Sequence, residues 1–260
     1  MARGWQAVGA PLRIYLTGPV CFEAGECVLW ESALPGPQGR HLLALLVAEH
    51  RRPLSRDELA TELWGDDLPM AWSSSLKALI SKLRSTLTAA GLPGGQLIRN
   101  AFGAYQFRLP ADGWIDIDEA ASRVHLAEAA VASGDLEAAA CDALVTRVIT
   151  ARPFLPGEHG AWAEAMRDRL NELRIRAIEC MAEIYLRRGN AGEAIRSAQL
   201  ALELDELRES SWRTLIRAHA DAGNLGKALG TYERCRAMLH DRLGAVPSPA
   251  TRAMHQELLR

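Results

Sequence analysis

The stretch Met70-Ala-Trp-Ser-Ser-Ser-Leu-Lys-Ala-Leu-Ile-Ser-Lys-Leu-Arg-Ser-Thr-Leu87 decides how the first third of the chain folds. Its large apolar residues recur at the spacing i, i+4, i+7 and i+11, at Leu76, Ile80, Leu83 and Leu87. This period is that of an amphipathic helix with one face on a hydrophobic core. We therefore expect a helix over residues 70–90 that ends at Gly91 and leaves its second face free.

Short strands and two further helices are predicted on either side of this helix. Runs of apolar residues at 12–16, 20–22 and 27–30, separated by turn residues, indicate a small antiparallel sheet. Helices are expected over 39–49 and 56–64, and a capping box of Ser55 and Glu58 opens the second of them. Residues 97–100 and 105–109 flank a turn and are typical of a β-hairpin. The predicted order is sheet, three helices, hairpin.

The helix over 70–90 and the hairpin share an uneven charge. No Asp or Glu occurs between Asp67 and Asp112, an interval that holds five Lys and Arg residues. Positive charge on a helix beside a hairpin suits a DNA duplex, with the helix in the major groove and the hairpin on the backbone. Small hydroxyl side chains allow close approach, and cations pair with phosphates or guanine edges. An ordinary solvated helix face is the alternative, which the order of elements disfavours. We predict that the DNA-contacting residues are Ser74, Ser75, Lys77, Ser81, Lys82, Arg84, Ser85, Arg99 and Asn100.

From residue 116 onward the sequence predicts helices almost exclusively. The expected helices span 117–133, 135–151, 160–188, 191–204, 209–222, 225–242 and 249–259. Gly189-Asn190 and Gly223-Asn224 lie 34 residues apart, the period of tetratricopeptide repeats. Gly134-Asp135 marks a third, offset copy, separated from the others by an insertion around 154–160. The second half therefore indicates a stacked array of helix pairs.

Composition and motif content exclude several function classes. With 48% hydrophobic residues, the chain of 260 residues can build packed cores, and a net charge of −2 gives no global nucleic-acid or membrane signature. The five cysteines are scattered, which argues against a zinc site or a disulfide framework. No phosphate-binding loop, nucleophile elbow or zinc-protease motif is present. No apolar run approaches the roughly 18 residues needed to span a bilayer. We expect a cytoplasmic protein that is not an enzyme, with no cofactor, no metal and no membrane partner.

Two groups of residues resemble one known family. Leu63-Trp64-Gly65-Asp66, followed by Ile80-Ser81-Lys82-Leu83-Arg84, resembles the winged helix of the Streptomyces antibiotic regulatory protein family. Leu207-Arg-Glu209, Trp212 and the ending Leu243-Gly-Ala-Val-Pro-Ser-Pro249 are similar to the helical bacterial transcriptional activation domain that follows in these proteins. The ending is the most specific part, and the two matches together cover about residues 12–260.

The resemblance implies a fold, a function and partners. The fold class is mainly α with a small β component. A winged helix-turn-helix of the response-regulator type is expected over residues 10–112, and an all-α, tetratricopeptide-like array over residues 113–260. The function implied is sequence-specific activation of transcription, often of secondary-metabolite gene clusters. Such proteins are expected to bind direct repeats in double-stranded promoter DNA as side-by-side dimers. They are also expected to recruit RNA polymerase holoenzyme through its sigma, alpha and beta surfaces. By motif match, Lys82 and Arg84 occupy recognition-helix positions.

Two other readings stay open at the level of sequence. In one, the helical array binds a protein partner and the winged helix is a protein dock without DNA affinity. In the other, the concave surface of the array senses a ligand, since repeat arrays form such grooves. The chain has no room for the nucleotide-binding and sensor domains of larger relatives. It is therefore expected to be a small family member or a fragment of a large one.

Overall fold

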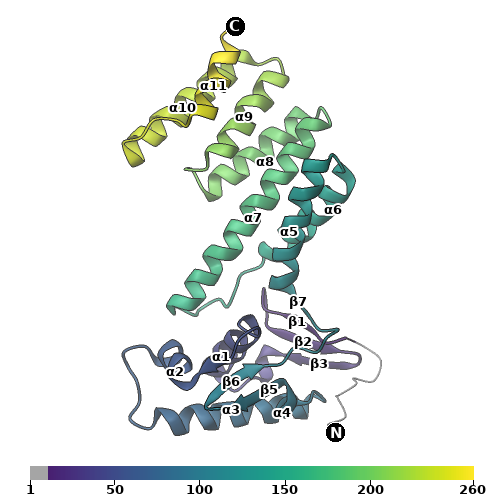
Figure 1. Ribbon diagram of the computed structural model, residues 1–260, viewed down its shortest axis with the longest axis vertical. Helices are drawn as coiled ribbons and strands as arrows, with labels where there is room; N and C mark the ends of the chain where they lie inside the picture. The colour runs from purple at the N-terminus through teal and green to yellow at the C-terminus, as the bar shows by residue number, and fades with distance from the viewer. Residues whose placement is uncertain (1–10) are drawn as a thin grey trace. The chain divides into compact units, whose positions relative to one another are not determined.

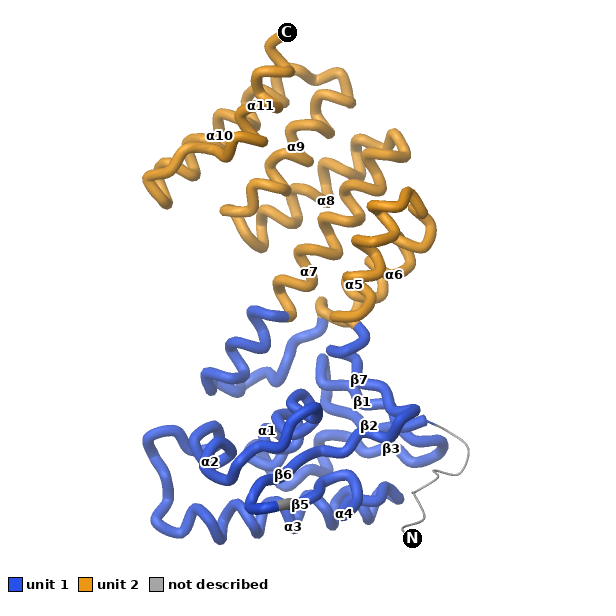
Figure 2. The backbone as a smooth tube through the Cα atoms, viewed as in Figure 1, with its two compact units in different colours: residues 1–119, 152–169 blue, residues 120–151, 170–260 orange. Residues whose placement is uncertain are grey.

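The polypeptide folds into two units, and each is assembled from two separate pieces of the chain (Figure 2). The computed structural model describes residues 11–260. Unit 1 comprises the described residues up to Glu119 together with Arg152–Arg169, and unit 2 comprises Ala120–Ala151 and Leu170–Arg260. The first predicted domain, which begins at residue 10, therefore has its first position outside the described residues.

A four-stranded sheet with the order β3-β2-β1-β7 opens unit 1 (Figure 1). Its strands are β1 (Arg13–Tyr15), β2 (Cys21–Ala24), β3 (Cys27–Trp30) and β7 (Trp114–Ile115). The first three are antiparallel neighbours, as the sequence predicts, whereas β7 pairs in parallel with β1. Strand β7 escaped prediction because two residues are too few to show an alternating pattern.

Three helices pack on a shared core after a short 3-10 turn at Glu31–Ala33. They are α1 (Gly36–Ala48), α2 (Arg56–Trp64) and α3 (Trp72–Ala89). Helix α1 is apolar around most of its circumference, and its residues Leu42–Val47 are all buried. Helix α2 begins at the predicted capping box, in which Ser55 Oγ accepts from the Glu58 amide and the Ser55 amide donates to the Glu58 carboxylate.

A second, three-stranded sheet completes the winged helix. Its order is β4-β6-β5, with β4 (Leu54–Ser55), β5 (Ile98–Ala101) and β6 (Ala104–Phe107), and the short helix α4 (Gly94–Leu97) leads into it. Strands β5 and β6 form the predicted hairpin, although both begin one residue away from the predicted positions. The rings of Phe22 and Phe107, 6.3 Å apart, join the two sheets through the core.

The segment Arg152–Arg169 belongs to unit 1 although unit 2 residues precede it along the chain. Its Phe154 forms a β-bridge with Thr17, and Arg167 donates hydrogen bonds to three carbonyl oxygens of the same segment. Asp116 also contacts the residues that follow β1. Its buried carboxylate accepts hydrogen bonds from the amides of Leu16 and Thr17 and from the Thr17 hydroxyl. Asp116, the first residue of α5, therefore anchors this helix to the end of β1.

Unit 2 contains the predicted helical array. Its helices, of which the first and third begin in unit 1, are α5 (Asp116–Ser133), α6 (Leu136–Thr150), α7 (Ala161–Arg187), α8 (Ala191–Leu204), α9 (Glu209–Asp221), α10 (Leu225–Leu243) and α11 (Pro249–Leu258). Every boundary lies within two residues of the predicted one. The prediction of a mainly α fold, with a winged helix followed by a helical array, is confirmed.

The turns between these helices explain why the boundaries are predictable. Gly134, Gly189 and Gly223 all have a positive φ, a conformation that favours glycine, and each stands two residues before the first residue of a new helix. Asp135 and Asn190 then cap α6 and α8, with side-chain oxygens that accept from backbone amides of the first turn.

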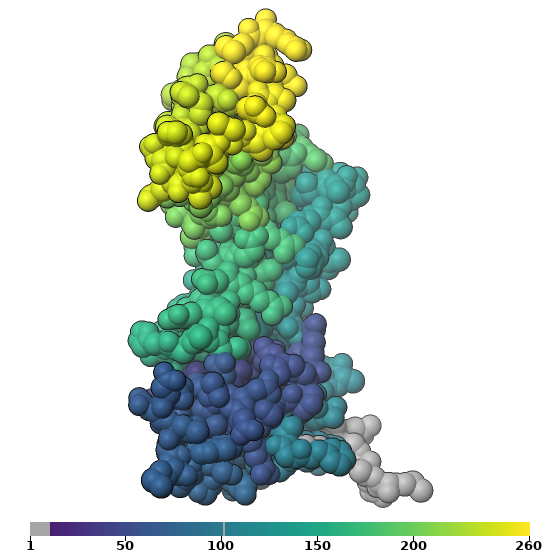
Figure 3. Space-filling model, turned by 60° about the vertical axis from the view of Figure 1, so that its left-hand side comes forward, coloured from purple at the N-terminus to yellow at the C-terminus, as the bar shows by residue number. Residues whose placement is uncertain are grey.

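Small residues bring successive helices of the array close together. Ala194 of α8 and Ala218 of α9 are fully buried and pack with Leu186 of α7. At the end of the array Tyr232 of α10 stacks on His255 of α11, and these two helices form one continuous surface, drawn yellow in Figure 3. No helix of the described chain is long and apolar enough to cross a bilayer.

Candidate nucleic-acid interface

Helix α3 carries the residues for which we predict DNA contacts. Its stripe of four large aliphatic residues is buried, as the spacing predicts: Leu76, Ile80, Leu83 and Leu87. The first turn is tied to the preceding loop, since the amide of Trp72 donates to Pro69 and the Ser74 hydroxyl donates to Ala71. The burial of one stripe fixes the rotation of the helix about its axis and so decides which side chains reach solvent.

The face opposite this stripe is free and cationic. Six of the predicted contact residues on it are exposed: Ser74, Ser75, Lys77, Ser81, Lys82 and Ser85. Within residues 11–260, no acidic side chain forms an ion pair with Lys77 or Lys82. Both ammonium groups are therefore available for an anionic partner. The small serine side chains beside them allow such a partner to approach the helix closely.

Arg84 differs from the two lysines, because the fold uses part of its side chain. It is half-buried, and its Nε donates a hydrogen bond of 3.0 Å to the carbonyl oxygen of Ile98 in β5. Its guanidinium carbon also lies 6.0 Å from the ring centroid of Tyr105 in β6. Arg84 thus holds the hairpin against α3, which run side by side in Figure 1. The sequence predicts a DNA contact here and does not reveal this positioning contact.

The hairpin presents the remaining predicted residues. Arg99 and Asn100 are exposed on β5, and Arg99 stands opposite Gln106 of β6. Gln106 in turn donates to the backbone carbonyl of His50, which anchors the hairpin to the end of α1. All nine predicted residues therefore lie on two elements, α3 and β5, that Arg84 joins. Phe102 at the hairpin turn carries no sequence signal that would mark it as a contact residue, although its ring is fully exposed.

An acidic residue of α2 close in sequence to this surface is neutralised within the fold. Glu58 pairs with Arg52 at 2.7 Å and also completes the capping box of α2. The hydrogen bond from Arg52 and those from Ser55 lower the pKa of Glu58 to about 2. Its negative charge is therefore matched locally by Arg52.

The loop between α2 and α3 exposes apolar side chains next to the cationic face. Met70 is fully exposed and Leu68 is nearly half exposed, both within six residues of the start of α3. Neither contributes to the core of unit 1. An exposed methionine is a flexible apolar group that suits contact with another protein.

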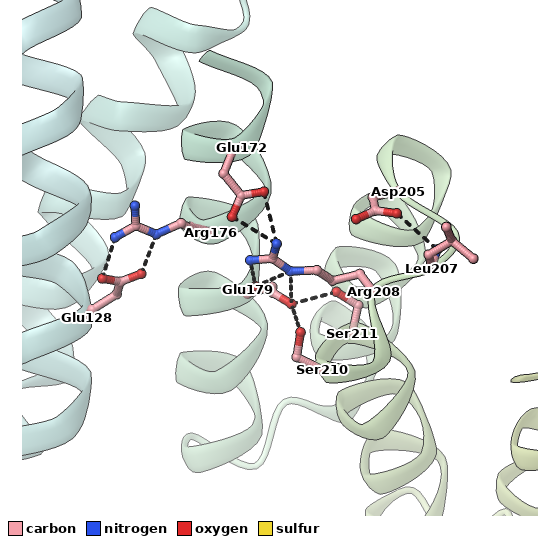
Figure 4. Close-up of polar contacts among 9 residues, drawn as sticks. All are labelled: Glu128, Glu172, Arg176, Glu179, Asp205, Leu207, Arg208, Ser210 and Ser211. Atoms are coloured by element: carbon pink, nitrogen blue, oxygen red, sulfur yellow. Dashed lines mark hydrogen bonds and ion pairs between the residues drawn. The ribbon is translucent and has the colours of Figure 1, made fainter. Parts of the chain in front are cut away.

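Unit 2 is held together by an ion-pair network (Figure 4). The guanidinium of Arg208, just before α9, lies between Glu172 and Glu179 of α7, with shortest contacts of 2.8 and 3.2 Å. The hydroxyls of Ser210 and Ser211 donate to the same Glu179 carboxylate. Burial opposes the charged form of Arg208, but its bonds to Glu179 and Glu172 raise its pKa.

The next residue extends the network to the end of the chain. Glu209 accepts hydrogen bonds from the Ser248 amide and the Thr251 hydroxyl at the start of α11. Burial raises the pKa of Glu209, whereas these hydrogen bonds lower it, and the net shift is downward. The segment Leu207-Arg208-Glu209, which we call the pin, therefore connects α9 to both α7 and α11 through ion pairs and hydrogen bonds.

Comparison with known proteins places both units in one family. Residues 115–259 match the bacterial transcriptional activator domain, and residues 33–104 match the C-terminal domain of transcriptional regulatory proteins. The chain belongs to the Streptomyces antibiotic regulatory protein family. It combines the C-terminal domain of transcriptional regulatory proteins with the bacterial transcriptional activator domain, as members of this family do. The resemblance found in the sequence is confirmed.

Several relatives from this family are longer than this chain. The regulatory protein AfsR of Streptomyces coelicolor is 30% identical over 254 residues, which are 96% of this chain and 24% of AfsR. The transcriptional regulatory protein EmbR of Mycobacterium tuberculosis is 28% identical over 86% of this chain and 58% of EmbR. The solved structure of M. tuberculosis EmbR in complex with a low affinity phosphopeptide superposes with a TM-score of 0.86 at 26% identity, covering 96% of this chain and 65% of that one. The chain thus spans about a quarter of AfsR and less than two thirds of EmbR.

Proposed function

We propose that this family member binds direct repeats in promoter DNA through α3 and the β5–β6 hairpin and recruits RNA polymerase. The observation that carries the proposal is the free, serine-lined face of α3 with two lysines that lack an acidic partner in the described chain. Family membership supplies the general role, and this surface supplies the residues.

The proposed role of each residue in DNA binding follows from the position of its side chain. Lys77 and Lys82 approach the DNA from α3, while the exposed serines allow the helix to enter the major groove. Arg99 and Asn100 reach the backbone from the hairpin. Arg84 fixes the hairpin through its Nε and offers its other N–H groups to phosphate. Because neutralised phosphates release counterions, affinity falls as salt rises, with a slope of about −0.9 per phosphate contact.

Recruitment is assigned to surfaces outside this face. Leu68 and Met70 in the loop before α3 offer an apolar contact to a polymerase subunit beside the DNA. Unit 2 offers a further surface to polymerase, whose sigma, alpha and beta subunits are the proposed partners. It also offers a surface to a second copy bound side by side at the next repeat. We divide these roles at residue 112, with DNA binding in 10–112 and activation in 113–260. Regulation of a secondary-metabolite gene cluster, without enzymatic activity, completes the proposal, and the cytoplasm is the location that it requires.

The test compares lysines that differ only in their position. A duplex is first selected by the wild-type protein from a random-sequence library, and binding is then followed by fluorescence anisotropy over a series of salt concentrations. Lys82→Ala and Lys77→Ala should each weaken binding and reduce the salt slope by about 1. Lys227→Ala is the matched control, because Lys227 is an exposed lysine of α10 in unit 2.

The outcomes separate DNA binding from its alternative. If the three variants bind the duplex like the wild type, the α3 face does not contact DNA. If the wild type selects no duplex even at low salt yet binds a protein partner, the winged helix is a protein dock and the proposal is wrong.

A further inference from the structure

The turn between β5 and β6 contains an unusual residue. Ala101 pairs with Ala104, so Phe102 and Gly103 form a two-residue hairpin turn. Both have a positive φ, 52° and 83°, which is the conformation of a type I′ turn. The first position of such a turn favours Asn, Asp or Gly, and a phenylalanine there costs conformational free energy. Local geometry alone therefore does not explain Phe102.

Packing does not explain the residue either. The side chain of Phe102 has a relative exposure of 109%, more than any other large hydrophobic residue of the described chain. The ring buries no apolar surface within the fold. A strained backbone and an unburied aromatic ring at the same position point to a contact outside the chain.

The surroundings of the ring define what it contacts. Arg99 and Asn100 are exposed on the same hairpin, and no acidic residue occurs from 68 to 111. Protein docking surfaces usually offer a wider apolar patch, whereas Phe102 is a single ring in a polar, cationic setting. Proteins that bind the minor groove combine cations with one apolar side chain that inserts between base pairs.

Contacts with neighbouring elements fix the position of the β5–β6 hairpin and so of the Phe102 ring at its turn. Arg84 of α3 bonds to Ile98 at the start of β5, and β6 pairs with β4 at the start of α2. The turn therefore moves together with α3. When α3 occupies the major groove, a hairpin fixed beside it is carried to the flanking minor groove.

We propose that the phenyl ring of Phe102 is a wedge that enters the minor groove and unstacks one base step. This inference rests on the proposed DNA-binding function and adds a specificity-determining residue to it. Pyrimidine–purine steps such as TA unstack most readily. The wedge therefore selects such a step in the flank of the site without any hydrogen bond to a base.

The experiment uses the full chain and a variant that suits the turn better than the natural residue. Phe102→Asn removes the ring but supplies the amino acid that a type I′ turn prefers, so its urea unfolding midpoint should equal or exceed that of the wild type. Phe102→Tyr retains an aromatic ring as the conservative control. The probe is a duplex selected by the wild-type protein from a random-sequence library, with 2-aminopurine placed in turn at each flanking step.

We expect wild-type protein and Phe102→Tyr to raise 2-aminopurine fluorescence at one step, because unstacking removes quenching. Phe102→Asn should leave that fluorescence unchanged and bind about tenfold more weakly, in keeping with the loss of one base–aromatic contact. Libraries selected by Phe102→Asn should lose the preference for a flexible step.

Other results overturn the inference. Equal affinity and equal fluorescence for Phe102→Asn would show that the ring does not enter DNA. A lower unfolding midpoint would show a structural role, and a loss confined to the pairing of two copies on adjacent repeats would show a protein contact. If the wild type selects no duplex at all, the DNA-binding proposal itself fails, which is a separate result.

Discussion

Replacement of Arg84 tests how the fold couples the recognition helix to the hairpin. Arg84→Ala removes a hydrogen bond of 3.0 Å from a charged donor to the Ile98 carbonyl, a type of bond that contributes about 1.5–3 kcal/mol. It also removes the contact with the Tyr105 ring, for which about 0.5–1 kcal/mol is typical at an exposed site. Because the guanidinium is only half-buried, we expect unit 1 to lose about 2 kcal/mol in its free energy of unfolding.

The measurement is urea unfolding followed by tryptophan fluorescence. All tryptophans of residues 11–260 except Trp212 lie in unit 1, so this signal reports mainly on that unit. Lys82→Ala, which removes an exposed charge from the same helix, should change the free energy of unfolding by less than about 0.5 kcal/mol. Arg84→Lys keeps the charge without the Nε donor and should lie between the wild type and Arg84→Ala.

DNA affinity supplies the second half of the test. Arg84→Ala should weaken binding more than Lys82→Ala does, because the hairpin loses its fixed position in addition to one charge. Arg84→Lys should retain the salt slope of the wild type while binding more weakly. The reasoning is refuted if Arg84→Ala unfolds at the same urea concentration as Lys82→Ala, since Arg84 would then have no positioning role.

Two further predictions concern the pin of unit 2. Arg208→Met removes the guanidinium that pairs with both Glu172 and Glu179. It should lower the free energy of unfolding by about 2 kcal/mol, measured by circular dichroism in urea. Equal stability of the variant and the wild type would contradict this role. Glu209→Gln should cost about 1 kcal/mol at pH 7, because the hydrogen bonds from Thr251 and Ser248 favour the carboxylate. Since the folded pKa of Glu209 lies below 4.5, this stabilisation is present above pH 4.5 and is lost as the pH falls below it, so melting curves of the two proteins should converge in acid.

The array was predictable because its signals are local. Each Gly-Asn or Gly-Asp turn combines a residue that tolerates a positive φ with a side chain that can cap the next helix, and both requirements are visible in the sequence. The buried stripe of α3 was predictable for the same reason. Its free face follows directly, which is why the positions of Lys77 and Lys82 agree with the expectation.

The parts that escaped prediction depend on contacts between distant residues. Nothing near Arg152 indicates that the following segment pairs with Thr17, more than a hundred residues earlier. The position of Asp116 at the start of a predicted helical region is visible in the sequence, but only the fold shows that its carboxylate binds the end of β1. Likewise, the spacing of Arg84 on α3 says where the residue lies on the helix but not that Ile98 is its partner.

The interleaving of the two units has a consequence for synthesis. The segment Arg152–Arg169, which completes unit 1, is made only after Ala120–Ala151 of unit 2 has been translated. A ribosome must therefore translate about two thirds of this chain before all residues of unit 1 are present. A fragment cut at the end of the hairpin would lack Arg152–Arg169 and also Asp116, whose carboxylate binds the end of β1, so we expect the winged helix to fold fully only when the chain extends through Arg169.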